Sequence, residues 1–221
     1  MASILRKFIS TRTPKFFFLK KAFNNKRFTL LDIGSGNHSP SKTTNLFPGC
    51  EYYGVDLNED YNYNEKDLKA LKAFYAMDLT KLEFGKIQDN FYDFVMMSHI
   101  IEHLHNGDKV LELLSKKIKK DGYIYIEFPG QKSTTLPSMV GTLNFHDDPT
   151  HVRVYSYKEV GDLLTKLGFK VVSSGMRKSW YYILTLPFTI LSHKLRGKQI
   201  TGPYYWDLMG FAEYVFAQKV K

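Results

Sequence analysis

The chain has 221 residues, 43% of them hydrophobic, which suits one medium α/β domain with its own core better than two independent domains. Its single cysteine, Cys50, excludes an internal disulfide bond. We find neither a secretory signal pattern nor an apolar stretch long enough to span a bilayer, so we expect a soluble intracellular protein, by default cytoplasmic.

The net charge of +9 is concentrated in two segments of the chain. Residues 1–31 contain eight Lys and Arg, residues 170–206 contain six, and neither segment contains an acid. Residues 32–169 hold fifteen basic and twenty acidic residues, so the middle of the chain is mildly acidic. Basic residues mixed with aromatic ones suit an anionic membrane surface or a phosphorylated polymer, and they equally suit the solvated face of terminal helices. A transit peptide is a less favoured interpretation.

Strand and helix patterns alternate after one or two amphipathic helices expected in the first thirty residues. Runs typical of buried strands lie near 29–33, 51–55, 74–77, 92–98 and 122–128. Helical patterns lie near 39–47, 65–72, 104–119 and 156–167. Because strands that alternate with helices pair in parallel, the chain predicts an α/β fold with a mostly parallel sheet.

Two more strands are predicted toward the C-terminus. Ser156 and Glu159 have the spacing of a capping box and start the last predicted helix, which Gly168 ends. A sixth strand begins at 168–172, and residues 211–220 alternate well enough to form the last one.

The insert 177–208 separates these two strands. A loop of this length is typical of a lid, a substrate platform or a membrane contact. Its apolar run 180–191 contains Pro187 and is too short to span a bilayer. The run therefore suits an interface or burial against the domain, and burial is our expectation.

A glycine turn after the first strand is the most informative motif. Residues 29–36, TLLDIGSG, join an apolar run to a glycine-serine-glycine turn, and Asp56 follows twenty positions after Gly36. The glycines let the backbone approach a ligand, and a carboxylate at the tip of the next strand can accept hydrogen bonds from ribose hydroxyls. A third glycine and a Gly-Lys-Ser/Thr motif are both missing, which disfavours pyrophosphate and triphosphate cradles. The pattern predicts a nucleoside-containing cofactor without a phosphate.

Five segments in order resemble the class I S-adenosylmethionine-dependent methyltransferases, type 11/23-like. They are LDIGSG (31–36), YGVDL (53–57), AMDL (76–79), YDFVMMSHIIEHL (92–104) and KDGYIYIE (120–127). The resemblance covers roughly residues 28–175. It implies a Rossmann-like seven-stranded, mostly parallel sheet with helices on both faces and an antiparallel last strand. It also implies a single domain over 1–221, with a basic helical extension at 1–28.

The resemblance further implies S-adenosylmethionine as cofactor, with S-adenosylhomocysteine as product. The methionine part would lie against Asp32, Gly34, Ser35 and Gly36. Asp56 would bind the ribose, with Leu57 beside the adenine. Asp78 would meet the adenine amino group, flanked by Met77 and Leu79, and Ser98 ends the fourth strand beside the cofactor.

Two polar clusters are expected where the strands end, on the methyl-acceptor side. On a helix start, His99 and His103 would lie one turn apart with Glu102 beside them, although such residues are often only helix caps. The His-x-x-Glu-His string also matches an inverted zinc-protease signature, which the surrounding methyltransferase motifs argue against.

The second cluster is NFHDDPTHVRVYS, residues 144–156. It resembles the Asp-Pro-Thr-His-x-Arg segment of bacterial glycan-pathway methyltransferases. His146 or His151 is a candidate general base, with Asp147 or Asp148 orienting it. The segment could equally be a capped turn with only a structural role. Our candidate catalytic residues are therefore His146, His151, His99 and Asp148.

These clusters together could also ligate a divalent metal. Small-RNA terminal 2′-O-methyltransferases use Glu-x-x-Glu-His and a later His for such an ion. This chain has His99 where the first Glu would stand, so the sequence does not favour a metal, and we assign no metal ligand.

The function expected first is O-methylation of a sugar or surface-glycan-pathway intermediate with a His general base. The basic flanks would hold an anionic or lipid-linked substrate, with peripheral contact at the inner membrane surface. Methylation of a small phosphorylated metabolite fits almost as well. The chain could also be an RNA 2′-O-methyltransferase or a non-catalytic cofactor-binding scaffold, although nucleic acid is the less favoured partner.

Overall fold

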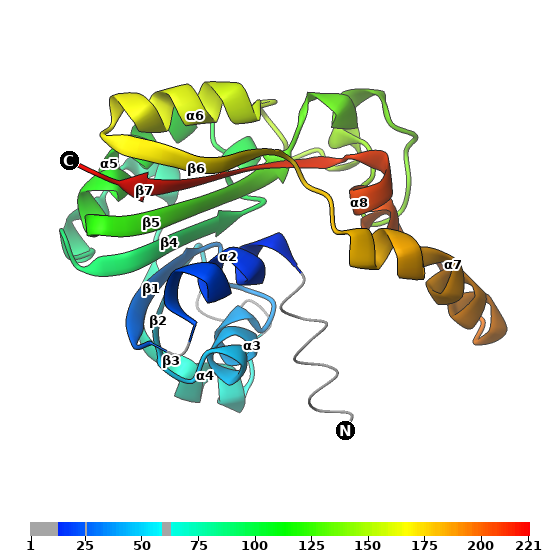
Figure 1. The fold of residues 1–221 in the computed structure, drawn as a ribbon, viewed down its shortest axis with the longest axis horizontal. Helices are drawn as coiled ribbons and strands as arrows, with labels where there is room; N and C mark the ends of the chain where they lie inside the picture. The colour runs from blue at the N-terminus through cyan, green and yellow to red at the C-terminus, as the bar shows by residue number, and fades with distance from the viewer. Residues whose placement is uncertain (1–12, 25, 59–62) are drawn as a thin grey trace.

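Seven strands form one sheet in the order β3-β2-β1-β4-β5-β7-β6 (Figure 1). The computed structural model describes residues 13–24, 26–58 and 63–221. The strands are β1 (Phe28–Ile33), β2 (Cys50–Asp56), β3 (Leu71–Ala76), β4 (Tyr92–Ser98), β5 (Ile118–Pro129), β6 (Phe169–Met176) and β7 (Ala212–Lys219). All neighbours pair in parallel except β7, which is antiparallel to both β5 and β6. The predicted sheet, with its antiparallel last strand, is confirmed.

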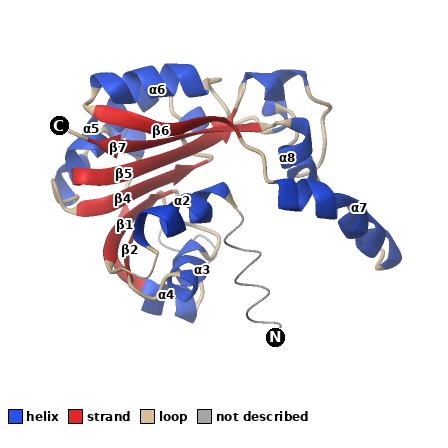
Figure 2. Cartoon of the chain, viewed as in Figure 1, coloured by secondary structure: helices blue, strands red, loops and turns tan. Residues whose placement is uncertain are grey.

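Helices cover both faces of the sheet (Figure 2). They are α2 (Pro14–Phe23), α3 (Ser39–Leu46), α4 (Glu65–Ala70), α5 (Gly107–Lys117), α6 (Tyr157–Lys166), α7 (Trp180–Leu195) and α8 (Trp206–Met209). Short 3₁₀ turns are η1 (Leu79–Lys81), η2 (Phe84–Lys86), η3 (Ile101–His103), η4 (Gln131–Thr135), η5 (Phe145–Asp147) and η6 (Gly202–Tyr205). Of the one or two helices expected in the first thirty residues, α2 is one, and any part that falls on residues 1–12 lies outside the described residues.

Two boundaries between a helix and the following strand differ from the prediction. The helix expected at 104–119 spans Gly107–Lys117, and the strand expected at 122–128 already begins at Ile118. The strand expected at 74–77 begins at Leu71, because Leu71 and Ala73 already pair with β2. The preceding helix, expected at 65–72, therefore ends at Ala70.

The core has two layers because alternate residues of the central strands point to opposite sides of the sheet. On β4, Val95 and Met97 pack under α5 and α6, whereas Phe94 and Met96 pack under α2. α2 is fixed to its face by aromatic stacking, with the Phe18 and Phe216 ring centroids 4.5 Å apart. With both faces buried, the functional groups are confined to the ends of the strands.

The insert extends away from the sheet as α7, next to α8 (Figure 1). Among the residues of α7 only Leu186 is buried, whereas Trp180, Leu184 and Phe188 are between 68% and 74% exposed. The expected burial of the run 180–191 against the domain is therefore wrong. The reason is that the side of α7 facing the domain carries Tyr and Thr residues, which line a cavity and leave the apolar side outside. None of the described helices is long and apolar enough to cross a membrane.

One partly buried polar contact ties the central strands together. The Asp93 carboxylate accepts hydrogen bonds from the Thr29 N–H at 2.8 Å and the Thr29 hydroxyl at 2.9 Å, and pairs with Lys119 at 2.8 Å. Burial tends to raise the pKa of Asp93, but the Lys119 ammonium and the Thr29 donors lower it below its usual value. The carboxylate form therefore stabilises the junction of β1, β4 and β5.

We expect Asp93→Asn to lower the free energy of unfolding by about 1–3 kcal/mol at pH 7, because the amide NH₂ then faces either the Thr29 donors or the Lys119 ammonium. A carboxyl whose pKa is lowered in the folded state stabilises the protein above its unfolded pKa, about 4, and loses this effect as the pH falls. The difference between wild type and variant should therefore shrink below about pH 4. Urea unfolding at both pH values measures it, with Asp162→Asn, at an exposed position, as the control.

Candidate active site

The glycine turn after β1 is tight and closely packed. Gly34 has φ +78°, and its N–H donates to the Val55 carbonyl at 2.8 Å. A Cβ atom on Gly34 would lie 2.2 Å from the Ile100 side chain, so no other residue fits without movement. The Ser35 hydroxyl is buried and bonded to the Tyr63 hydroxyl at 2.7 Å.

Asp56 ends β2 directly beside this turn. One of its carboxylate oxygens accepts a hydrogen bond from the Gly36 N–H at 3.0 Å, and the other accepts one from the Leu57 N–H at 2.8 Å. The Leu57 side chain is 64% exposed next to it. The structure thus brings together the carboxylate, the turn and the apolar neighbour that the resemblance assigns to the cofactor.

Asp32 lies beneath the turn. Its carboxylate is buried and accepts hydrogen bonds from the Ser39 hydroxyl at 2.6 Å and from the Tyr52 hydroxyl. Burial raises the pKa of Asp32 above its usual value. These contacts hold the start of α3 and β2 against β1, so the observed contacts of Asp32 support the turn from below.

The residues expected around the adenine lie at the ends of β2 and β3. Leu57, Met77 and Asp78 line one hollow of about 350 Å³. Asp78 accepts hydrogen bonds from the Thr80 N–H and hydroxyl through one oxygen, and these bonds lower its pKa. Leu79 is 8% exposed and belongs to the core behind the hollow.

Ser98 ends β4 on the same edge of the sheet. Its buried hydroxyl has no hydrogen-bond partner among the described residues. A buried hydroxyl without a partner is costly unless a ligand completes it. Together with the close turn at Gly34 and the carboxylate at Asp56, this arrangement fits a nucleoside cofactor.

His99 directly follows β4, on the side of the sheet where the methyl acceptor is expected. It lies between two carboxylates. Its Nδ1 lies 3.4 Å from Glu102 and its Nε2 lies 3.1 Å from Glu127. Burial alone would lower the pKa of His99, but the two carboxylates raise it to about 9. An imidazolium has no lone pair to accept a proton, so this environment suits a charged positioning group better than a general base.

Arg177 joins the insert to the end of β5. Its guanidinium lies 2.9 Å from Glu127 and 3.0 Å from Asp207 at the start of α8. The Trp206 ring lies 4.8 Å from the His99 ring. Burial tends to raise the pKa of Glu127, but Arg177 and His99 hold it well below its usual range. Sequence reasoning missed Arg177, Asp207 and Trp206, and the one signal was an acid, Glu127, in the otherwise apolar run 122–128.

The loop 144–153 is held by Asp147. This carboxylate accepts hydrogen bonds from the Ser138 hydroxyl and from the Met139, Leu143 and Asn144 N–H groups. These donors outweigh the effect of burial and hold its pKa well below its usual range. Asp147 is therefore engaged in loop structure, as a capped turn requires, and does not orient a histidine.

The two histidines of this loop have different surroundings. His146 is exposed, and its ring makes no hydrogen bond with any described residue. The His151 Nδ1 donates to the Phe145 carbonyl at 2.7 Å, which leaves its Nε2 facing Glu102 and Asp148 at 3.9 Å each. Asp148 also accepts hydrogen bonds from the Thr150 N–H and hydroxyl.

His103 completes this cluster from the turn after β4. Its ring centroid lies 4.8 Å from that of His151. One ligand atom each of Glu102, His103 and His151 lies within 4.8 Å of the others, a spacing that could hold a metal ion. The loop 144–153 and the turn η3 thus form one polar cluster.

A family model described as a methyltransferase domain matches residues 1–174 of the chain. No functionally curated protein matches the sequence. By this match the protein belongs to the methyltransferase domain family, and with its fold it is a class I methyltransferase, an enzyme that uses S-adenosylmethionine.

Solved structures of S-adenosylmethionine-dependent methyltransferases share the fold. One from Archaeoglobus fulgidus is 23% identical, with a TM-score of 0.62 over 98% of this chain and 94% of its own. One from Mesorhizobium loti is 12% identical, with a TM-score of 0.66 over 93% and 97%. Phosphoethanolamine N-methyltransferase 2 of Haemonchus contortus, in complex with S-adenosylmethionine, is 15% identical, with a TM-score of 0.63 over 92% and 51%.

We expect Asp56→Ala to weaken S-adenosylhomocysteine binding at least about 100-fold, because hydrogen bonds to a charged group contribute about 1.5–3 kcal/mol each. Isothermal titration calorimetry measures the affinity, and circular dichroism checks the fold. Glu51→Ala, which removes an exposed acid from the same strand, is the control and should bind normally. An affinity in a folded Asp56→Ala variant within about threefold of wild type would contradict the ribose assignment.

Proposed function

We propose that the protein methylates a hydroxyl group of a sugar, in a glycan-pathway intermediate that is anionic or lipid-linked and lies at a membrane surface. The observation that carries this proposal is α7. This helix turns a polar side toward a cavity near the acceptor groups and an apolar side toward solvent.

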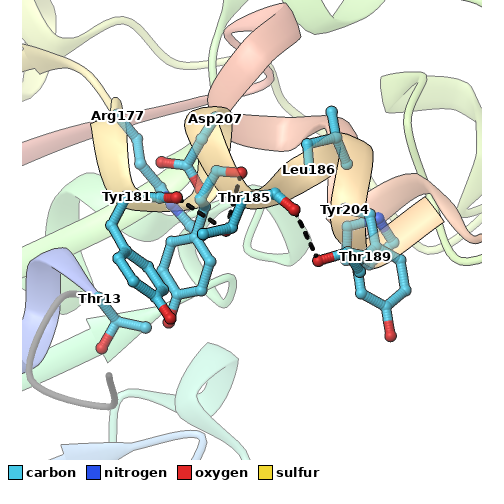
Figure 3. A pocket seen from close by; sticks show the side chains of 10 residues that line it. Thr13, Arg177, Tyr181, Thr185, Leu186, Thr189, Tyr204 and Asp207 are labelled. Carbon is cyan, nitrogen blue, oxygen red and sulfur yellow. Dashed lines mark hydrogen bonds and ion pairs between the residues drawn. The ribbon is translucent and has the colours of Figure 1, made fainter. Parts of the chain in front are cut away.

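The cavity has a volume of about 420 Å³ and lies between α7, α8 and the start of α2 (Figure 3). Arg177 and Asp207 line it, and the same Arg177 reaches Glu127 beside His99. α7 contributes the side chains of Tyr181, Tyr182, Thr185, Leu186 and Thr189. Aromatic rings with a few polar groups suit the apolar faces and hydroxyl edges of a sugar, which supports this acceptor class.

The outward side of α7 carries five large apolar side chains, each between 56% and 79% exposed: Trp180, Leu184, Phe188, Leu191 and Leu195. With 3.6 residues per turn, these positions fall within a sector about 80° wide. A continuous exposed apolar stripe of this kind is typical of a surface that contacts a membrane or a partner.

Charge favours a membrane as the occupant. Lys178 precedes α7, and Lys194, Arg196 and Lys198 lie at its end, all of them exposed. The sequence contains no acid from residue 163 to residue 206. A Leu or Phe side chain contributes about 1.5–3 kcal/mol on burial, and a Lys or Arg near an anionic leaflet about 1 kcal/mol. α7 would therefore lie in the interface of an anionic bilayer without crossing it.

We assign to His146 the role of the general base that takes the proton of the acceptor hydroxyl. S-adenosylmethionine supplies a methyl group activated on a sulfonium, so the residues of the chain have to align the hydroxyl, exclude water and take its proton. The His99 imidazolium has no lone pair, and the His151 Nε2 faces the buried Glu102. The exposed ring of His146 is left to accept the proton, and its neighbour Phe145 packs 4.7 Å from His151.

We expect the enzyme to transfer a radiolabelled methyl group from S-adenosylmethionine into glycan or lipid-linked glycan of a fractionated cell extract. His146→Gln should lower this transfer about 100-fold, the scale of a lost general base, and keep S-adenosylhomocysteine binding. His105→Gln, at an exposed histidine outside the loop, is the control and should transfer normally.

Normal transfer by His146→Gln overturns the base assignment. Label in the RNA fraction, together with RNA binding that weakens steeply as the salt concentration rises, contradicts the glycan proposal and supports RNA 2′-O-methylation. Label in small molecules favours a phosphorylated metabolite. No label in any fraction, with cofactor binding intact, favours the alternative that the protein is a non-catalytic cofactor-binding scaffold.

We expect the purified enzyme to sediment with phosphatidylcholine vesicles that contain phosphatidylglycerol, and to be released as salt screens the basic residues. Leu184→Glu with Phe188→Glu should lower vesicle binding at least about tenfold, because two buried apolar side chains are replaced by charges. The matched control, Leu68→Glu with Val172→Glu, changes two exposed apolar residues on α4 and β6 and should bind normally.

Analytical ultracentrifugation of the same variants tests whether a second copy of the chain covers the stripe. A wild-type dimer that ignores vesicles and becomes monomeric on Leu184→Glu with Phe188→Glu contradicts the membrane proposal, since α7 is then a self-association surface.

A further inference from the structure

We propose that Glu102, His103 and His151 bind one divalent transition-metal ion on the acceptor side of the sheet. Their ligand atoms, one carboxylate oxygen and two ring nitrogens, lie within 4.8 Å of one another. His103 and His151 come from different segments of the chain and meet with ring centroids 4.8 Å apart. From the sequence a metal at these clusters is possible but not favoured, and the fold brings these three ligand atoms together.

Hydrogen bonds orient both imidazoles for ligation. The His151 Nδ1 lies 2.7 Å from the Phe145 carbonyl, and the His103 Nδ1 lies 2.9 Å from the Thr150 hydroxyl and 3.3 Å from the Thr150 carbonyl. A ring that donates from Nδ1 to a carbonyl keeps the Nε2 lone pair for another partner. Metal-binding histidines are held in this way in most metal sites.

Glu102 supplies the second, independent observation. Its side chain is fully buried, and neither carboxylate oxygen has a hydrogen-bond partner in the part of the chain that the structure describes. The nearest ring nitrogens to Oε1 belong to His99 at 3.4 Å and His151 at 3.9 Å. The His99 ring at 3.4 Å is an ionic neighbour of Oε1 only, and Oε2 has no partner among the described residues. A buried carboxylate that is so incompletely paired is costly, and a cation at the cluster would satisfy it.

The charges around Glu102 leave room for a cation. Three buried carboxylates lie along this side, those of Glu102, Glu127 and Asp207. The basic groups in contact with them are His99, Arg177 and His151, and Arg177 already lies against both Glu127 and Asp207. With His151 neutral, as a metal ligand has to be, carboxylates outnumber cations whether or not His99 is protonated.

The donor set favours particular metals. Two imidazoles and one carboxylate suit Zn²⁺, Co²⁺ or Mn²⁺, whereas Mg²⁺ and Ca²⁺ prefer all-oxygen ligands. Three protein ligands also leave coordination positions open, as in catalytic zinc sites. His103 is only partly buried, so the open positions have access to the acceptor side.

We test this with the metal alone, on full-length enzyme treated with a chelator and dialysed. Calorimetric titration should give one tight site for Zn²⁺ and for Co²⁺, and none of comparable affinity for Mg²⁺, while bound Co²⁺ should show the visible absorption of an ordered site. Glu102→Gln and His151→Ala should each weaken binding at least about tenfold. The control is His105→Ala, an exposed histidine of the same segment, which should bind normally.

Binding of S-adenosylhomocysteine checks that each variant is folded. No saturable Zn²⁺ or Co²⁺ site in the wild type, or equal affinity in Glu102→Gln, His151→Ala and wild type, overturns the proposal. The titration needs no methyl acceptor, so it stands or falls separately from the proposed glycan substrate.

Discussion

The ion-pair bridge through Arg177 is the interaction on which the acceptor side depends. Its guanidinium lies between Glu127 at the end of β5 and Asp207 of α8, so it fixes the insert to the sheet. The same Glu127 lies against His99 and helps to keep it protonated. Because all four groups are largely buried, a change in one alters the charge balance of the others. The position of α7 and the charge state of His99 and Glu127 are therefore linked.

The cofactor half was largely predictable because its signals are local. A strand, a glycine turn and a carboxylate at the next strand tip are short-range features, and parallel strands bring their carboxyl ends to one edge. The contact between Asp56 and Gly36 follows from that topology. The antiparallel last strand could be predicted only through the family resemblance, since alternation in residues 211–220 says nothing about direction.

The acceptor half could not be predicted because its contacts are long-range. Only the likeness to the Glu-x-x-Glu-His segment connects His103 with a later histidine such as His151, and no pattern indicates that Arg177 reaches Glu127 across fifty positions. The loop 144–153 had two interpretations: the contacts of Asp147 bear out the structural one, and the catalytic one stays a prediction for the exposed His146. For α7, the sequence identified an apolar run. Such a run does not predict which side of the helix packs against the rest of the domain and which side stays exposed.

The orientation of α7 also limits how an acceptor would enter. In the proposed function, the stripe from Trp180 to Leu195 lies in the bilayer interface, and the opposite side of the same helix lines the polar cavity. A free sugar gains nothing from this arrangement, whereas a lipid-linked one can keep its chains in the membrane while its sugar enters the cavity. Anchoring both enzyme and acceptor to one surface raises their local concentration, so weak contacts in the cavity suffice for productive binding. The polar residues that line the cavity can then contribute more to orienting the acceptor hydroxyl than to the affinity for the acceptor.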